Sequence, residues 1–186
     1  MIERIVFSGT GGQGVITAAV LLAEAALFGE GLNAVQTQVY GPEARGGSAR
    51  SDVIIADKEI WFPKVLEPNL LICLSQMAYD RYSPLVRPGG VVITDPFYVR
   101  RWQNANSREI ELPLHETISR LNADTDRSIE GINMCLLGAL SRLMPVVGLE
   151  SIRDAVRKRF PGPLGELNAK ALEAGAGLVA GSVATF

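Results

Sequence analysis

The pattern of hydrophobic and polar positions in the first half of the chain predicts strands that alternate with helices. A short β-branched run at Ile2–Ser8 is typical of a strand, and the alanine- and leucine-rich stretch Val15–Phe28 is long enough for a helix. Gly29 and Gly31 end that helix. The alternating segment Ala34–Val39 then predicts a second strand, which completes a βαβ unit and favours the α/β class.

Further strand-like segments extend this sheet. Ala49–Ala56 and Glu59–Phe62 flank a turn at Asp57-Lys58, so we expect a hairpin there. The later apolar runs Asn69–Leu74 and Gly90–Asp95 predict two buried strands, with a helix between them at Gln76–Tyr82. Glu109–Leu112 predicts one more strand.

The second half of the chain is helical in pattern from Leu114 onward, and Ile129–Leu143 is its most apolar segment. Pro145, Pro161 and Pro163 separate the later helices. With 186 residues, one domain is the expectation. We therefore predict a single Rossmann-like, three-layer α/β domain over residues 1–186, with a mostly parallel sheet and a helical C-terminal part.

Composition excludes several classes of protein. The chain is 47% hydrophobic and 20% charged, with 18 basic and 20 acidic residues and a formal charge of −2. This balance disfavours nucleic-acid binding, which needs an excess of Lys and Arg. No apolar run reaches the ~18 residues of a membrane span. The start, Met1–Phe7, leads directly into a strand without a signal-peptide pattern, so we expect a cytoplasmic protein.

Cysteine usage limits the chemistry that this chain supports. Cys73 and Cys135 are its only cysteines, and each lies in an apolar run, which predicts buried free thiols. Two cysteines and one histidine are too few for an iron–sulfur cluster or a structural zinc site. We therefore expect no metal ligands here and assign any redox metal to another chain.

The segment from residue 9 to residue 14 is the clearest candidate for a binding site. Its sequence fits G-x-G-x-x-G and lies directly between a predicted strand and a predicted helix. Glycines let backbone N–H groups approach an anion, and the helix dipole stabilises phosphate there. The predicted cofactor-binding residues of this glycine loop are Gly9, Thr10, Gly11, Gly12, Gln13 and Gly14.

Two common phosphate-binding motifs fit this loop poorly. A Walker A loop has Lys and Ser or Thr where this chain has Val15 and Ile16. A dinucleotide fold has an acidic residue about 20 positions later, but the nearest acid, Glu43, lies beyond the second strand. A phosphorylated cofactor other than NAD is favoured. The alternative is that the glycines only permit a tight turn and close helix–sheet packing.

A second loop, Tyr40–Gly47, follows the second predicted strand and so is expected beside the glycine loop, at the carboxyl edge of the sheet. Its arginine has the planar guanidinium that binds carboxylate or phosphate through two hydrogen bonds. The alternative is a solvated surface loop. The predicted substrate or interface residues are Tyr40, Glu43, Arg45, Gly46 and Gly47.

Together the two loops resemble those of the gamma subunit of the 2-oxoacid:ferredoxin oxidoreductases. The motif at residues 41–47, Gly-Pro-Glu-Ala-Arg-Gly-Gly, is most similar to that of the 2-oxoglutarate type. The similarity extends over nearly the whole chain, through Ser51–Ile55, Glu59–Pro63, Gln76, Gly89–Ile93, Asn133-Met134, Leu137-Gly138 and Leu167-Asn168.

The resemblance implies a subunit of an enzyme that converts 2-oxoglutarate to succinyl-CoA and CO2 and reduces ferredoxin. It implies alpha and beta partner subunits, with a ferredoxin-like delta subunit as a further candidate; these partners carry thiamine diphosphate, Mg and the iron–sulfur cluster. The chain lacks the Gly-Asp-Gly thiamine signature of the beta subunit, so we expect no catalytic residue in this chain alone. Its glycine loop would hold the phosphates of coenzyme A, while Tyr40, Glu43 and Arg45 would face the subunit junction.

Two other functions stay open at this point: a free-standing NAD(P)- or flavin-dependent reductase, and an assembly protein whose glycine loop is only structural. His115 is the only histidine and is expected on the surface or at a helix start. Asp95 suits either a site or a turn before Pro96. The basic patch of Arg153, Arg157, Lys158 and Arg159 is expected to be a solvated helix face, with an acidic partner as the alternative.

Overall fold

The computed structural model describes residues 1–39, 49–100, 107–123 and 131–179. Within these residues the chain forms one six-stranded sheet with the order β2-β3-β1-β4-β5-β6. The strands are β1 (Ile2–Gly9), β2 (Asn33–Val39), β3 (Ala49–Ala56), β4 (Leu70–Cys73), β5 (Val91–Thr94) and β6 (Arg108–Glu111).

Helices account for most of the remaining described residues. They are α1 (Val15–Phe28), α2 (Gln76–Tyr82), α3 (Leu114–Ala123), α4 (Ile132–Leu143), α5 (Leu149–Arg159) and α6 (Pro163–Val179), with a short 3-10 helix, η1 (Ser83–Leu85), after α2. None of these described helices combines the length and the apolar character needed to cross a lipid bilayer.

The sheet is parallel through β1, β4, β5 and β6, as expected, but β3 runs antiparallel between β1 and β2. The predicted βαβ unit therefore exists only in a modified form, because β2 is not the neighbour of β1. The predicted hairpin is wrong: Glu59–Phe62 forms no strand. Both edges of β3 are already paired with β1 and β2, so no partner is left for residues 59–62.

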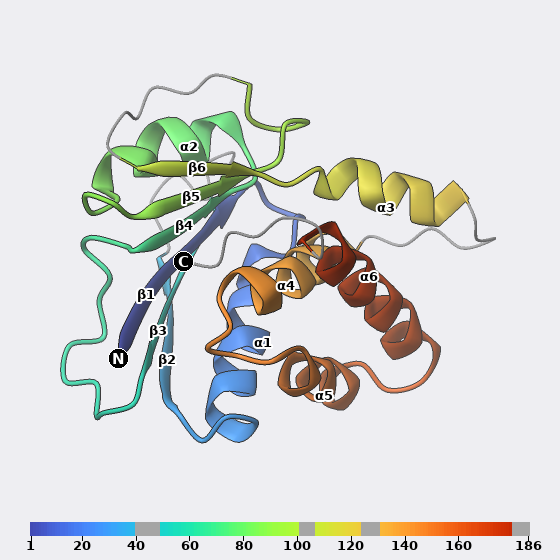
Figure 1. Ribbon diagram of the computed structural model, residues 1–186, viewed down its shortest axis with the longest axis horizontal. Coiled ribbons are helices and arrows are strands. Elements are labelled where there is room, and N and C mark those ends of the chain that lie inside the picture. Colours follow the sequence, from blue (N-terminus) through green and yellow to red (C-terminus); the bar gives the residue numbers. More distant parts are fainter. Residues whose placement is uncertain (40–48, 101–106, 124–130, 180–186) are drawn as a thin grey trace.

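Helices cover both faces of the sheet, which confirms the expected three-layer α/β arrangement (Figure 1). Alternation along β1 sends Ile5 and Phe7 into the larger core, which is formed with α1, α4, α5 and α6. Val6 points to the opposite face and joins a smaller core with Tyr79 of α2. The glycine loop follows β1, so it lies where the largest helix layer meets the carboxyl edge of the sheet.

Both cysteines are buried free thiols, as predicted. The side chains of Cys73 and Cys135 have no exposed surface. Burial raises the pKa of Cys135 to about 12 and that of Cys73 well above its usual value. Neither thiol is positioned to ionise or to reach a metal at neutral pH.

Helices α4 and α6 pack with their backbones in direct contact. A Cβ atom on Gly138 would lie 1.8 Å from the carbonyl oxygen of Leu172, and one on Gly175 would lie 1.7 Å from that of Cys135. Only glycine allows this approach at either position. The contact fixes α4, whose first turn touches the glycine loop.

We expect Gly138→Ala to destabilise the protein by about 3 kcal/mol or more, because the added methyl group must push two helix backbones apart. The matched control is Gly177→Ala in α6, where a Cβ meets nothing within 4 Å. Helix propensity predicts that this control is neutral or gains up to about 1 kcal/mol. Urea unfolding of the two variants measures the difference, and equal stabilities would contradict the close packing.

Candidate functional site

One side chain, Gln13, holds the glycine loop in place. Its Oε1 accepts a hydrogen bond from the Thr10 N–H at 2.7 Å, and its Nε2 donates to the carbonyl of Leu74 at 2.7 Å. The Gln13 N–H also donates to the Thr10 carbonyl at 3.4 Å, which closes a turn. The loop between β1 and α1 is thereby fastened to the residue that follows β4.

Three of the four glycines are required by the chain itself. Gly12 and Gly14 have φ values of 90° and 70°, in the region that disfavours other residues. A Cβ on Gly14 would also lie 2.3 Å from the Asn133 amide nitrogen. A Cβ on Gly9 would lie 2.4 Å from Oε1 of Gln13. Backbone conformation and packing therefore explain glycine at positions 9, 12 and 14.

Gly11 is different, because a Cβ there would meet nothing within 4 Å and its φ is not positive. Thr10, Gly11 and Gly12 are exposed and form the outer rim of the loop. Behind this rim, α1 begins at Val15 without a side-chain cap and without an acidic residue in its first turn. Uncapped N–H groups and the positive end of the helix dipole favour an anion at this place.

Asn133, in the first turn of α4, supports the loop from the helical layer. Its Nδ2 donates to the Gly14 carbonyl at 3.3 Å, and its Oδ1 accepts from the Met134 N–H at 3.0 Å. The side chain is 9% exposed. Asn133 thus connects two segments that are 119 positions apart, and local sequence patterns give no sign of this contact.

The residues predicted in the second loop lie outside the described part of the chain: Tyr40, Glu43, Arg45, Gly46 and Gly47. The described residues on either side of them do have a clear location. Gly9 pairs with Ala49, and Arg50 pairs with both Ser8 and Val39. The described residues Val39 and Ala49 therefore lie at the level where the glycine loop begins.

Asp95, at the end of β5, connects two further loops at this edge of the sheet. Its Oδ1 accepts from the Phe97 N–H at 2.8 Å and its Oδ2 from the His115 N–H at 2.7 Å. The residue is 1% exposed, and burial raises its pKa, while the two hydrogen bonds offset part of the rise. Asp95 therefore both makes the expected turn and crosslinks β5 to the start of α3.

Three rings, those of Phe97, Tyr98 and His115, pack together next to the Asp95 hydrogen bonds and form an aromatic group. The rings of Phe97 and His115 are stacked, with centroids 3.6 Å apart and planes 12° from parallel. The Tyr98 ring meets Phe97 edge-on at 4.9 Å, and its hydroxyl lies 3.4 Å from Nδ1 of His115. Burial raises the pKa of Tyr98, and a hydrogen bond with the Gln13 side chain offsets part of that rise. Because β1, β4 and β5 end at one level of the parallel sheet, the aromatic group after β5 lies at the same sheet edge as the glycine loop, a juxtaposition that the sequence pattern does not reveal.

No group of three or more His, Cys, Asp or Glu residues in the described part of the chain is placed to hold a metal ion. The described candidate site consists of backbone N–H groups, the amide side chains of Gln13 and Asn133, and aromatic rings.

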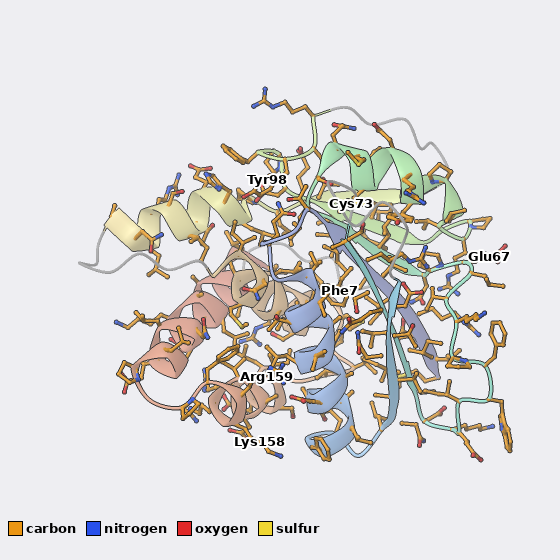
Figure 2. All side chains as sticks on the ribbon, turned by 180° about the vertical axis from the view of Figure 1, so that it is seen from behind. Phe7, Glu67, Cys73, Tyr98, Lys158 and Arg159 are labelled. Carbon is orange, nitrogen blue, oxygen red and sulfur yellow. The ribbon has the colours of Figure 1, made fainter. Side chains whose placement is uncertain are left out.

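A cavity of about 310 Å³ lies elsewhere, between the C-terminal end of α1 and α5. Figure 2 shows Lys158 and Arg159 there, far from Tyr98 and Cys73 at the other end of α1. Its walls hold two acidic and two basic side chains: Glu24, Asp154, Lys158 and Arg159. These charges cancel, and Arg159 lies 3.9 Å from Glu24, so nothing here selects an anion.

The basic patch on α5 is largely paired with carboxylates. Arg153 forms ion pairs with Glu150 at 2.7 Å and Glu173 at 3.0 Å. Arg157 lies 3.9 Å from Asp154. This pairing favours the solvated helix face over a surface for an acidic partner.

Comparisons with known proteins agree with one another. The family model for pyruvate ferredoxin/flavodoxin oxidoreductase matches residues 4–178. The 2-oxoglutarate synthase subunit KorC of Methanocaldococcus jannaschii is 40% identical over 176 residues, which cover 94% of this chain and 92% of the relative.

Solved structures give the same result. The keto/oxoacid ferredoxin oxidoreductase gamma subunit from Geobacter sulfurreducens PCA superposes with a TM-score of 0.83 at 36% identity, and the match covers 96% of each chain. The fold also matches a 2-oxoglutarate:ferredoxin oxidoreductase from Magnetococcus marinus with 2-oxoglutarate, coenzyme A and succinyl-CoA bound. That TM-score is 0.82 at 20% identity, over 95% of this chain and 31% of the other.

We expect Asp95→Ala to lower the free energy of unfolding by about 2 kcal/mol, because two backbone N–H groups lose their acceptor. Asp154→Ala, at an exposed ion pair, is the control and should change it by less than about 0.5 kcal/mol. Both values come from urea unfolding of the purified chain.

The cost of Asp95→Ala should also depend on pH. Because the pKa of Asp95 is raised in the folded state, its stabilising contribution is full below the unfolded-state pKa, about 4, and falls as the pH rises through the folded-state pKa. The stability difference between the wild type and Asp95→Ala should therefore shrink from pH 4 to pH 8. A difference that grew over this range would contradict the penalty for burying the charged form.

Proposed function

The chain belongs to the pyruvate ferredoxin/flavodoxin oxidoreductase family, and we propose that its glycine loop binds the phosphates of coenzyme A. It is a gamma subunit of a 2-oxoacid:ferredoxin oxidoreductase of the 2-oxoglutarate type, as the resemblance of its two loops implied. In this proposal residues 1–186 form one gamma-type domain, and the assembled enzyme converts 2-oxoglutarate and coenzyme A to succinyl-CoA and CO2 while it reduces ferredoxin.

The observation that carries this proposal is the open position of Gly11. The fold requires glycine at positions 9, 12 and 14, but nothing in the described chain restricts position 11. A ligand that lies against the backbone supplies the missing reason, because even a small side chain would hold it away from the N–H groups. The uncapped N-terminus of α1 indicates that this ligand is an anion.

The loop's contribution to the reaction is binding and orientation. Backbone N–H groups around Gly11 and Gly12 would neutralise the pyrophosphate of coenzyme A, and Gln13 would keep the loop in the receptive shape. Held at this end, coenzyme A would extend its thiol arm toward the neighbouring subunit. Positioning of this kind accelerates a reaction by removing the entropy cost of bringing two reactants together.

We assign the second loop to the subunit junction. This assignment is supported by its flanking residues Val39 and Ala49, which lie at the level of Gly9 on the same sheet edge. Within it, Tyr40, Glu43 and Arg45 are the residues we propose to face the junction.

The same geometry argues against a free-standing NAD(P)-dependent reductase. In dinucleotide folds the second strand lies beside the first and ends in an acid that holds the ribose. Here β3 separates β2 from β1, and β2 runs from Asn33 to Val39 without an acidic residue. The ribose position of such a fold is therefore taken by another strand.

Thiamine diphosphate, Mg and the iron–sulfur cluster belong, in this proposal, to the partner subunits. A cluster needs exposed or convergent thiolates, whereas Cys73 and Cys135 are separately buried in the two cores. We infer alpha and beta subunits as partners, a ferredoxin-like delta subunit as a further one, and ferredoxin as the electron acceptor. Two reduced thiols fit a cytoplasmic location.

We expect Gly11→Asp to raise the KM for coenzyme A at least tenfold in the purified complex while the KM for 2-oxoglutarate stays within twofold. A carboxylate at the rim would repel phosphate, and the open space and ordinary φ at position 11 let the loop keep its shape. Gly12 is a poorer choice because any side chain there is strained at φ 90°. Initial rates with a viologen dye measure both constants.

Gly11→Asn is the matched variant of the same size and without the charge, and it should raise the KM for coenzyme A much less than Gly11→Asp. Equal effects of the two variants would mean that bulk rather than charge matters at the rim. Equal effects of Gly11→Asp on both substrates would contradict phosphate binding by the loop.

The subunit role has its own test. Mild affinity purification of the tagged chain from its own host should recover subunits that carry thiamine diphosphate and an iron–sulfur cluster. The recovered complex should oxidise 2-oxoglutarate in a reaction that depends on coenzyme A. A chain that came back alone and bound NADH tightly would instead support a free-standing reductase.

A further inference from the structure

Phe97 presents an aromatic surface beside the glycine loop. Its side chain is 53% exposed, although it is large and apolar. One face of its ring is stacked on His115, and Tyr98 meets it edge-on at 85°. Within the described residues no ring covers the other face.

This ring is held in a fixed orientation. The Phe97 N–H is hydrogen-bonded to buried Asp95, and so is the N–H of His115, which carries the ring stacked beneath Phe97. The parallel register Ser8–Cys73–Thr94 places the start of this group, after β5, at the same edge of the sheet as the glycine loop after β1. A rigid aromatic ring loses little conformational entropy when a flat ligand stacks on it.

We propose that the exposed face of Phe97 stacks against the purine base of the ligand whose phosphates the glycine loop holds. The inference rests on the proposed function and extends it by assigning the base, which the loop itself cannot recognise. A flat π-surface and an anion-binding loop at the same edge of the sheet match the two ends of an adenosine diphosphate group. In this arrangement His115 acts as a support for Phe97 rather than as a base.

We expect Phe97→Ala to raise the KM for coenzyme A about tenfold in the purified complex, because an aromatic–base stack is lost. Pantetheine, which has the same thiol arm but no adenosine or phosphate, should react equally well with the wild type and the variant. Phe97→Trp should retain or lower the KM for coenzyme A. Phe62→Ala, at a 58% exposed phenylalanine outside the site, is the control and should leave both constants unchanged.

A binding measurement without turnover provides a second readout. The fluorescence of 1,N6-etheno-coenzyme A changes when its base stacks on an aromatic ring. The wild-type complex and Phe97→Trp should quench this probe on binding, and Phe97→Ala should quench it far less at saturating probe. Unchanged quenching and an unchanged KM in Phe97→Ala would overturn the inference.

Further outcomes separate this inference from the proposed function. If Gly11→Asp weakens binding of coenzyme A and Phe97→Ala does not, the loop holds phosphate but the base lies elsewhere, and the inference is overturned alone. If neither variant has an effect, both fail. If Phe97→Ala releases subunits from the complex on gel filtration while the KM for coenzyme A of the remaining complex is unchanged, the ring packs against a partner, and the inference is overturned.

Discussion

The hydrogen bonds of the Gln13 side chain determine what this edge of the molecule offers to a ligand. Gln13 joins the glycine loop to itself through Thr10 and to the sheet through Leu74, each at 2.7 Å. Without them, the outer residues Thr10 to Gly12 would lose the side-chain hydrogen bonds that fix their shape, and the Asn133 amide would hold only the inner end of the loop at Gly14. With them, the N–H groups at the start of α1 stay uncovered behind a rim of small residues, and that exposure is what an anionic ligand requires.

The remaining parts of the site depend on that loop and on the order of the strands. Because β1, β4 and β5 are parallel neighbours, the segments that follow them emerge together. Asp95 uses this proximity to hold Phe97 and His115, and Asn133 reaches the loop from α4, which is packed tightly on α6. The binding edge is therefore a product of the whole fold, although it is made of short loops.

Local patterns predicted the features that depend on neighbouring residues. The α/β class, the helix at Val15–Phe28, the buried cysteines and the position of the glycine loop all follow from periodicity and from glycine spacing, and the structure confirms them. Strand order is a long-range property, so the sequence did not reveal that β3 lies between β1 and β2. The local pattern of Glu59–Phe62 predicts a strand, but it does not show that both edges of β3 are already paired with other strands.

Long-range contacts also explain which site residues were missed. The hydrogen bond between Asn133 and Gly14 joins positions 119 apart, and the one between Asp95 and His115 joins positions 20 apart. Asp95 did carry a weak signal, an acid at the end of a buried strand before a proline. Phe97 carried none, because an aromatic residue in a loop looks the same in sequence whether it is buried or presented to a ligand.

Hydrogen–deuterium exchange at the glycine loop tests whether this loop binds the phosphates of coenzyme A. The complex would be compared with and without coenzyme A, and with pantetheine as the ligand that lacks phosphates. We expect coenzyme A to slow exchange of the backbone N–H groups from Gly11 to Thr17, and pantetheine to leave it unchanged. Unchanged exchange in this segment under saturating coenzyme A would show that the phosphates bind elsewhere.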